Sequence, residues 1–299
     1  MNKSVEPDWA WYRSFLGVME HGSLSAAARA LGLAQPTMGR HIDSLESALG
    51  LKLFTRSFDG FAPTDAALEL QPYAAGLAAT AAALRRAANS HGAGVRGTVR
   101  LTASEIIGVE VLPPILASLR RDHPELTVEL MLSNQANDLL HREADIAVRM
   151  FSPAQAALVA RRVGAIEVGL HAHRQYLERH GTPKSLQELQ GHTVVGFDRA
   201  NELIRRVQKR FGAFERSTLA FRADSDLAQL AAIRSGFGIG VCQSPLARQD
   251  AGLVRVLPDQ FSVELDTWVA MHEDLRGSPR CAVMFSALVK GIAAYIKGD

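Results

Sequence analysis

Hydrophobic positions near the N-terminus predict three short helices separated by tight breaks. In the first segment these positions follow a spacing of three and four residues: Trp9, Tyr12, Phe15, Leu16 and Met19. Asp8 and Ser23 are suited to cap the first two segments, and Gly22 and Gly32 are suited to end them. The third segment, AQPTMGRHIDSLESALG, ends at Gly50 and carries one apolar stripe: Met38, Ile42, Leu45 and Leu49. Helix, short helix, tight turn and helix is the order of a helix-turn-helix.

The next two segments predict a hairpin and a long helix. LKLFTRSFDGFAPT indicates two short strands with Asp59–Gly60 at the tip. Thr64 can cap an alanine-rich helix, in which Pro72 is expected to cause a bend or a weak point. Of the 23 residues from 66 to 88, 11 are alanine. The seam positions of this helix repeat as heptads over about three repeats: Ala66, Leu70, Tyr73, Leu77, Thr80 and Leu84.

This heptad seam has two interpretations. It fits an alanine-rich helix buried in a core, and it fits a helix that pairs with a second copy of the chain. A long helix between two domains has little core to join, so we favour dimerisation along the seam. The residues expected at that interface are Leu70, Tyr73, Leu77 and Leu84.

From about residue 97, short β-like runs alternate with helical stretches. The expected strands are VRLTA, TVELML, ADIAVRM, EVGLHAH, TVVGF, TLAFRA, GIGVCQ and LDTWVAM. Helices are expected around 113–121 and 137–142, and over SDLAQLAAIRSG. A further helix is expected to begin at Ser185, with Glu188 completing a capping box. This alternation predicts a parallel or mixed sheet with helices on both faces, whose ligands bind beyond the carboxyl ends of the strands.

Composition and charge narrow the class of protein. The 299 residues are enough for about two domains. The 33 Lys and Arg against 31 Asp and Glu give a net charge of +2, so no overall basic field marks a nucleic-acid or membrane partner. Cys242 and Cys281 are too few for a disulfide scaffold or a structural zinc site. With no signal-like N-terminus and no run of about 18 apolar residues, we expect a soluble protein of a reducing compartment.

The stretch FLGVMEHGSLSAAARALGLAQPTMGRHIDSLESALGLKLFTRSFDGFAPT closely resembles the winged helix-turn-helix of the LysR-type transcriptional regulators. A looser similarity continues through GTVRLTASEIIGVEVLPPILASLRRDHPELTVEL, EADIAVRM, QELQGHTVVGF and AAIRSGFGIGVC. The resemblance implies an α+β multi-domain chain with a winged helix-turn-helix over 1–63, a linker and dimerisation helix over 64–94, and an effector-binding domain over 95–299. By the same resemblance the last domain has two α/β lobes like a periplasmic solute-binding protein, over 97–167 with 268–299 and over 168–267.

The function implied by this resemblance is ligand-responsive, sequence-specific regulation of transcription in the cytoplasm, without enzymatic activity. The implied partners are double-stranded operator DNA, a small-molecule effector, RNA polymerase and the chain itself, as a dimer or a pair of dimers. Two other classes stay open. The chain could be a solute-binding or enzymatic α/β protein with a helical interaction domain, or an adaptor that docks proteins on its helix-turn-helix. Salt-dependent retardation of DNA separates the adaptor from the regulator.

The third helix carries the residues expected to read bases. With the Met38 stripe packed inward, steps of 100° per residue place Pro36 and Arg40 on the outward face. Gln35 and Thr37 flank them near the helix N-terminus, the end that enters the major groove in this motif. Gln pairs with adenine and Arg with guanine, and Thr suits a phosphate or a thymine methyl group. The alternative for Arg40 is an ordinary surface charge that pairs with its own helix.

Two departures from the family pattern, and the charge balance of residues 1–63, affect the expected binding of DNA. The family usually has serine where this chain has Ala34 and Gly39, which removes two hydroxyl contacts. Arg56 matches the wing arginine of the family, which approaches the minor groove or the backbone; its alternative is a solvated charge. Residues 1–63 hold six basic and six acidic side chains, so their net charge is zero. With few phosphate contacts per subunit, a monomer is expected to bind DNA poorly.

Ser104 ends the first expected strand of the effector domain, directly before a helical segment. A hydroxyl beside the free N–H groups of a helix start suits a carboxylate or another anion. By resemblance the effector cleft lies there, and matching positions border it from the two lobes: Ser133, Arg149, Phe197 and Ser225. We therefore expect a small organic anion as effector, and no other cofactor. The alternative is that Ser104 and Ser225 only cap helices and that Arg149 pairs with a nearby acid.

The remaining signals have simpler interpretations. The glycines of GFGIG (236–240) follow a helix and precede a strand, the reverse of a dinucleotide fingerprint, so we expect close-packed turns. No Cys or carboxylate cluster joins His171 and His173, so strand-edge or core positions are expected instead of metal ligands. Cys242 and Cys281 are expected to be buried structural thiols. No catalytic triad or carboxylate pair stands out in the sequence.

Overall fold

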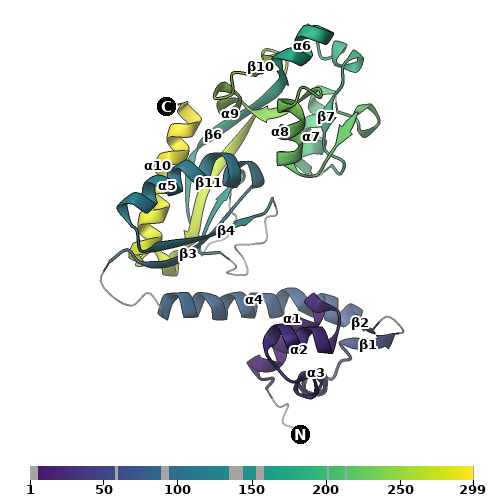
Figure 1. Cartoon of the computed structure of the whole chain (residues 1–299), viewed down its shortest axis with the longest axis vertical. Helices are drawn as coiled ribbons and strands as arrows, with labels where there is room; N and C mark the ends of the chain where they lie inside the picture. Colours follow the sequence, from purple (N-terminus) through teal and green to yellow (C-terminus); the bar gives the residue numbers. More distant parts are fainter. Residues whose placement is uncertain are drawn as a thin grey trace. The chain divides into compact units, whose positions relative to one another are not determined.

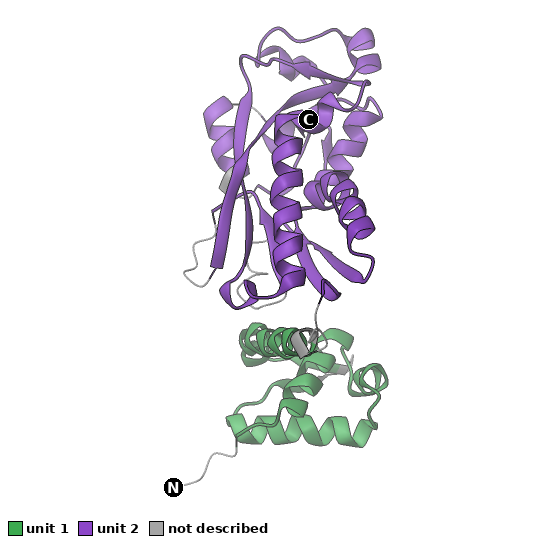
Figure 2. Cartoon of the chain, turned by 90° about the vertical axis from the view of Figure 1, so that its left-hand side faces the viewer, with its two compact units in different colours: residues 1–89, 137–143 green, residues 90–136, 144–299 purple. Residues whose placement is uncertain are grey.

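The computed structural model describes residues 6–57, 60–88, 94–134, 144–152, 158–200, 202–212 and 214–298. The chain forms two compact units, each with its own hydrophobic core (Figure 2). The first unit contains the described residues up to 88, and the second contains the described residues from 94 onward.

Three helices open the first unit (Figure 1): α1 (Trp9–His21), α2 (Leu24–Leu31) and α3 (Gln35–Leu49). The Asp8 carboxylate and the Ser23 hydroxyl each accept a backbone N–H in the first turn of the helix that follows, at 2.8 and 3.2 Å. Gly22, Gly32 and Gly50 close the three helices with φ of 69°, 68° and 67°, the left-handed region that favours glycine. The predicted caps and ends are therefore confirmed.

The apolar stripe of α3 forms the centre of the first core. Met38, Ile42 and Leu45 are buried, and they share one cluster with Phe15 of α1 and Ala27 of α2. This packing fixes which face of α3 is left for solvent. The predicted helix-turn-helix order and its inward stripe are confirmed.

A two-stranded wing and a long helix complete the first unit. The wing strands β1 (Phe54–Ser57) and β2 (Gly60–Pro63) pair antiparallel. Asp59, at the expected tip of the hairpin, lies outside the described residues. The helix α4 (Asp65–Ala88) is capped by Thr64, whose Oγ1 accepts the N–H of Ala67 at 3.2 Å, and it continues through Pro72 without a break. The predicted cap and helix are confirmed.

The seam of α4 is mostly uncovered. Leu70 is half-buried and packs against the core of the first unit. Tyr73 and Leu84 are 69% and 70% exposed, and Leu77 is 48% exposed. The seam therefore presents large apolar side chains to solvent beyond its first turns.

A seven-stranded mixed sheet forms the second unit, in the order β10-β6-β11-β5-β3-β4 with β9 beside β6. The strands are β3 (Gly97–Ala103), β4 (Leu126–Leu132), β5 (Ile146–Arg149), β6 (Leu158–His173), β9 (Ile239–Gln243), β10 (Leu253–Val256) and β11 (Ser262–His272). The long antiparallel strands β6 and β11 run through the whole sheet (Figure 1). We call the part with β3, β4 and β5 the first half, and the part with β9 and β10 the second half.

Helices cover both halves of this sheet. The first half carries the π-helical segment η1 (Ile107–Val111) with α5 (Leu112–Asp122) and α10 (Pro279–Lys297). The second half carries α6 (Arg174–His180), α7 (Glu202–Phe211), α8 (Asp226–Arg234), α9 (Ser244–Arg248) and a small parallel pair, β7 (Val195–Gly196) and β8 (Phe221–Arg222). Short 3-10 turns lie at Glu188–Gly191, Arg216–Thr218 and Glu273–Leu275. One core cluster joins the halves, with Ile107 and Met284 from the first and Ile233 from the second.

Several elements differ from the sequence prediction. The helix expected at Ser185 is only a 3-10 turn over Glu188–Gly191. Ser185 Oγ accepts the N–H of Glu188, but the Glu188 carboxylate bonds to Lys184 and not back to Ser185, so the capping box does not close. The strand expected from residue 167 begins at Leu158, because its first residues pair with β11 although they lack an apolar alternation. The helix expected around 137–142 lies outside the described residues.

The terminal helix α10 corrects the prediction that no segment could span a membrane. Over Pro279–Lys297 it is long and apolar enough to do so by length and composition alone. Its apolar side chains instead fill the core of the second unit, where Cys281, Met284, Leu288 and Ile292 are each 0% exposed. The composition of α10 is that of a core helix.

Candidate functional site

The outward face of α3 is polar and open. Gln35, Pro36 and Arg40 are exposed, and Thr37 is half-buried beside them. All four lie in the first two turns of the helix: Pro36 and Arg40 lie opposite the buried Met38, and Gln35 and Thr37 flank them. The structure therefore brings these predicted residues together at the N-terminal end of α3.

Two details of this face bear on DNA recognition. The Arg40 guanidinium reaches back one turn and donates to Thr37 Oγ1 at 3.4 Å, a long hydrogen bond that a better acceptor would replace. A Cβ added at Gly39 would meet no other atom within 4 Å. Where the family usually has serine, Gly39 therefore leaves open space on the outward face of α3.

Glu46, in the last turn of α3, was not singled out by the sequence and holds the wing in place. Its Oε1 accepts the N–H of Leu53 at 2.9 Å and that of Phe54 at 3.3 Å, and its Oε2 binds Lys52. Burial alone would raise the pKa of Glu46, but the hydrogen bonds from Lys52 and the two backbone groups hold it below the ordinary value. The carboxylate is therefore charged, and it ties the start of β1 to α3.

The wing arginine is described only through its backbone. Arg56 lies in β1 and pairs with Phe61 of β2, and its side chain lies outside the described residues. Phe61 packs on Phe54, whose ring in turn contacts Phe15 of α1, with centroid distances of 5.7 and 5.8 Å. The base of the wing is thus anchored to the first core by aromatic contacts.

A cavity of about 530 Å³ lies in the second unit at the ends of the strands. Four of the predicted effector residues line it: Ser104, Ser133, Arg149 and Phe197. Ser225 does not line it, although its neighbours Asp224 and Asp226 do. Apolar side chains make up much of the wall, among them Phe214, Leu219 and Phe261. The volume and the mixture of an apolar wall with a few polar groups are typical of a small-molecule site.

Arg149 is a buried cation at the wall of this cavity. It is 4% exposed, and its guanidinium donates to Thr102 Oγ1 at 2.8 Å and to the carbonyl of Val148 at 3.0 Å. These bonds hold the guanidinium at the end of β5 in a fixed orientation. A buried, oriented guanidinium is suited to a planar anion.

Ser225 has a different position from the predicted one. It caps α8, because its Oγ accepts the N–H of Ala228, and its hydroxyl donates to Glu105 Oε2 at 2.7 Å. Beside it, Asp226 accepts a hydrogen bond from Asn134 at 3.3 Å. Burial, together with the nearby Glu105 carboxylate, raises the pKa of Asp226 to about 6. No pattern in the sequence indicates this carboxyl pair, because Glu105 and Asp226 are 121 positions apart.

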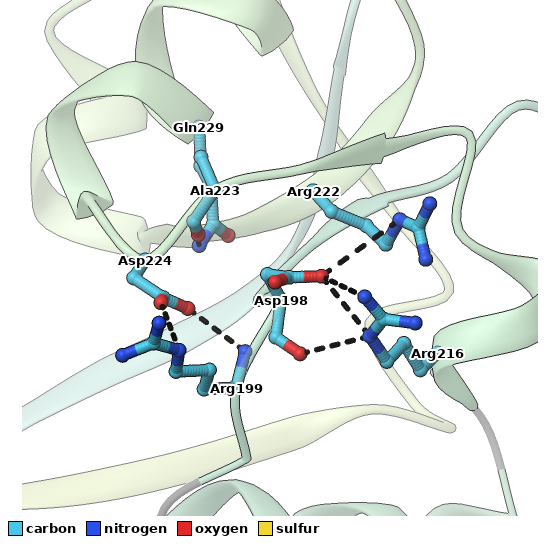
Figure 3. A network of polar contacts seen from close by, with 7 residues as sticks. All are labelled: Asp198, Arg199, Arg216, Arg222, Ala223, Asp224 and Gln229. Atoms are coloured by element: carbon cyan, nitrogen blue, oxygen red, sulfur yellow. Dashed lines mark hydrogen bonds and ion pairs between the residues drawn. The ribbon is translucent and has the colours of Figure 1, made fainter.

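A polar network fixes the loop that carries Phe197 (Figure 3). Asp198 binds Arg216 at 2.8 Å, and the backbone N–H of Arg199 donates to Asp224 at 2.8 Å. Gln229 of α8 is 4% exposed, and its Nε2 donates to the carbonyl of Ala223 at 2.7 Å. These contacts join the ends of β7 and β8 to the start of α8, and so they shape one wall of the cavity.

The other sequence signals lie in packed positions. A Cβ at Gly238 would collide with the Thr193 carbonyl, which accounts for glycine in this turn. His171 is 3% exposed, and burial lowers its pKa to about 4, so the ring is neutral in the core. Cys242 and Cys281 are both buried, and burial raises the pKa of Cys242 to about 12. The expectations of tight turns, a core histidine and buried thiols are confirmed.

Each of the two units matches a known family description. "Bacterial regulatory helix-turn-helix protein, lysR family" matches residues 9–68, and "LysR substrate binding domain" matches residues 92–293. The chain belongs to the LysR family. The helix-turn-helix and the α/β unit of this LysR-family protein are thus its DNA-binding and effector-binding domains, as the sequence resemblance implied.

Named relatives support this membership. A transcriptional regulator of Xanthomonas campestris pv. campestris is 32% identical over 181 residues, which cover 60% of this LysR-family chain and 53% of the relative. The matched part thus spans about half the length of that relative. A Klebsiella pneumoniae protein named "Probable HTH-type transcriptional regulator LtrA" is 26% identical over 307 residues, covering 100% of the chain and 98% of the relative.

Solved structures show the same fold. CbnR, a LysR-family transcriptional regulator, matches with a TM-score of 0.70 at 18% identity, over 95% of this chain and 99% of CbnR. CbnR bound to its target DNA matches with a TM-score of 0.66, over 96% of this chain and 99% of that one. The virulence activator AphB of Vibrio cholerae matches with a TM-score of 0.62 at 23% identity, over 95% and 99% of the two chains. At these identities the likeness establishes the fold of the LysR family in this chain.

Proposed function

We propose that this protein is a cytoplasmic, ligand-responsive regulator that reads operator DNA with α3 and that it is not an enzyme. The observation that carries the proposal is the division of α3 into two faces. Met38 is buried in the first core, whereas Gln35 and Arg40 are exposed at the N-terminal end. In helix-turn-helix proteins this end of the second motif helix enters the major groove of double-stranded DNA.

The exposed groups on α3 set the expected contacts. Arg40 pairs with the O6 and N7 of a guanine, and Gln35 pairs with an adenine. Thr37 contacts a phosphate or a thymine methyl group, and Gly39 allows close approach of the backbone. Arg56 of the wing neutralises a phosphate, and its removal is expected to weaken binding to all sequences alike.

The protein acts as a dimer, with pairing of dimers into tetramers as the next level of assembly. Tyr73, Leu77 and Leu84, exposed along α4, support self-association, since large apolar side chains at heptad spacing pair with a second helix. A two-fold dimer presents two copies of α3 to half-sites about 34 Å apart, or a multiple of that distance. RNA polymerase is the partner on which a regulator bound beside a promoter acts.

The cavity of the second unit binds the effector, and a small organic anion is its class. Arg149, buried and fixed in orientation at the cavity wall, supports this assignment. Ser104 and Ser133 add hydroxyl groups at the ends of β3 and β4, and Phe197 adds an aromatic wall. Ser225 does not contact the effector in this proposal; it contributes to the effector site by capping α8, which lines the cavity.

Selection of DNA duplexes from a random pool tests the proposed reading of DNA. The full-length protein is expected to enrich a two-fold symmetric sequence with half-sites about one helical turn apart. Affinity for the selected duplex is expected to fall with salt. No enrichment over the starting pool would refute sequence-specific reading.

A thermal-shift screen of small organic acids tests the effector class. An acid that binds the native cavity raises the melting temperature of the protein, and Arg149→Ala is expected to remove that increase. The same acids as uncharged amides serve as the matched control. An increase that persists in Arg149→Ala would move the anion site elsewhere.

A further inference from the structure

The chain after Ser104 forms an unusual helix at the edge of the effector cavity. Over Ile107–Val111 the helix is of π type, and the N–H of Leu112 bonds to the carbonyl of Ile107, five residues earlier. Glycine at 108 lies close to β4, and a Cβ there would force the Leu132 side chain to move. Such insertions are rare and occur frequently at functional sites.

The π-helix brings two acidic side chains toward the same neighbour. Glu105 and Glu110 are five residues apart, and the wider π turn brings residues of this spacing closer to one face than an α-helix would. Both carboxylates bond to residues of the second half of the sheet. Glu105 accepts from Ser225 at 2.7 Å, and Glu110 accepts from both terminal nitrogens of Arg234 at 2.9 Å.

Ser225 and Arg234, the partners of Glu105 and Glu110, lie at opposite ends of α8. Ser225 is the N-cap of this helix, and Arg234 is its last residue. A third bond, from Asn134 to Asp226 at 3.3 Å, reinforces the N-terminal end. Between them, Gln229 and Leu230 of α8 line the cavity. One wall of the cavity is therefore tied at both ends to the opposite half of the sheet.

The contact between Arg234 and Glu110 is a bidentate ion pair between two half-buried side chains. The Arg234 and Glu110 side chains are 35% and 21% exposed, and their bidentate geometry fixes direction as well as distance. Arg234 also binds Asp250 at 3.2 Å, within its own half. Hydrogen bonds to Glu110 are the largest cause that raises the pKa of Arg234.

We propose that Glu105 and Glu110 are positioning residues of the cavity, a two-point clasp on α8 that holds the two halves of the sheet together around the effector. The clasp acts on the geometry of the cavity and not on the effector itself. It rests on the proposed function only in taking the cavity as the effector site.

Hydrogen exchange measured by mass spectrometry on the full chain, without DNA or effector, tests this clasp. In Glu110→Gln, peptides over 226–234 and 105–111 are expected to exchange on the order of tenfold faster, because both sides lose their shared ion pair. Asp250→Asn is the matched control, since it removes the other carboxylate from Arg234 without touching the first half. It is expected to leave 105–111 unchanged.

A second variant keeps the proposal testable if Glu110→Gln folds poorly. Glu105→Ala removes the acceptor for Ser225 and the charge beside Asp226, and it is expected to raise exchange at the N-terminal end of α8 and not at Arg234. Unchanged exchange of α8 in both Glu110→Gln and Glu105→Ala would overturn the clasp. Because neither DNA nor an effector is present, that result would leave the proposed function untouched.

Discussion

Glu46 accepts the backbone N–H of Leu53 at 2.9 Å, so the last turn of α3 is bonded to the residue directly before β1 of the wing. The contact spans seven positions of sequence and crosses the turn at Gly50. A charged acceptor in a buried place sets the angle between α3 and the wing more firmly than apolar packing alone would. The wing and α3 are therefore one recognition surface.

Glu46→Gln is expected to destabilise the first unit by about 1–2 kcal/mol, because the charged acceptor for Lys52 and two backbone groups is lost. The lowered pKa of Glu46 means that its contribution is present above the ordinary value of 4.5 and disappears as the pH falls through the folded value. Denaturant unfolding at pH 7 and pH 4 measures both effects. If the free energy of unfolding fell equally in the wild type and in Glu46→Gln between pH 7 and pH 4, this role of Glu46 would be contradicted.

Unfolding is followed by tryptophan fluorescence in a Trp268→Phe background. The remaining tryptophans, Trp9 and Trp11, both lie in α1, so the signal reports on the first unit alone. Asp43→Asn is the matched control: it removes an exposed carboxylate of the same helix that forms no hydrogen bond described in the structure. Its effect on stability is expected to stay within about 0.5 kcal/mol.

Gly39→Ser is expected to stabilise the first unit by about 0.5 kcal/mol, because serine is the better helix former and a Cβ at this place meets open space. The new hydroxyl lies on the reading face, so affinity for DNA is expected to stay equal or increase. Thermal unfolding and fluorescence anisotropy measure the two. A clear loss of stability would show that the space around Gly39 is filled.

Leu77→Glu is expected to convert the dimer to a monomer with little affinity for DNA, because it places like charges opposite each other in the α4 seam. Leu68→Glu is the matched control, since Leu68 is 53% exposed on the same helix but lies off the heptad positions. Light scattering gives the mass of each variant. A Leu77→Glu protein that stays dimeric and binds DNA would place the dimer interface elsewhere.

Asp226→Asn is expected to remove a pH dependence of stability. The pKa of Asp226 is raised from 3.8 to about 6 by burial and by Glu105, so the protonated form stabilises the fold. Its contribution is complete below about pH 4 and is lost as the pH rises through 6. We expect a difference on the order of 1–3 kcal/mol between those limits, measured by denaturant unfolding. Asp224→Asn, two residues away and paired with Arg199, is the control and is expected to keep the wild-type slope.

Local chemistry made much of the first unit predictable. Caps at Asp8 and Ser23 and glycine at the helix ends depend on neighbours within four residues, and the stripe at Met38 depends only on helical spacing. The outward position of Arg40 follows from the same spacing. Glu46 was missed because its partners lie beyond a turn, where spacing carries no information.

The cavity was predictable only in part. Ser104, Ser133, Arg149 and Phe197 lie at strand ends, and the topology of the sheet gathers such positions. The pairs Glu105–Ser225 and Glu110–Arg234 join positions 120 and 124 apart, and no periodicity in the sequence indicates these contacts or the π-helix over Ile107–Val111. The helix expected from Ser185 is only a 3-10 turn over Glu188–Gly191, and the Glu188 carboxylate accepts the N–H of Lys184 instead of closing the predicted capping box.

Binding of Arg40→Ala to the duplex selected by the wild type, measured by anisotropy at fixed salt, shows whether α3 reads the operator. We expect a loss of about 1–3 kcal/mol, together with loss of preference at one guanine position. Arg13→Ala, which removes an exposed arginine of α1, is the matched control and is expected to keep that preference. Wild-type affinity and unchanged base preference in the Arg40→Ala dimer would contradict the claim that α3 reads the operator through this face.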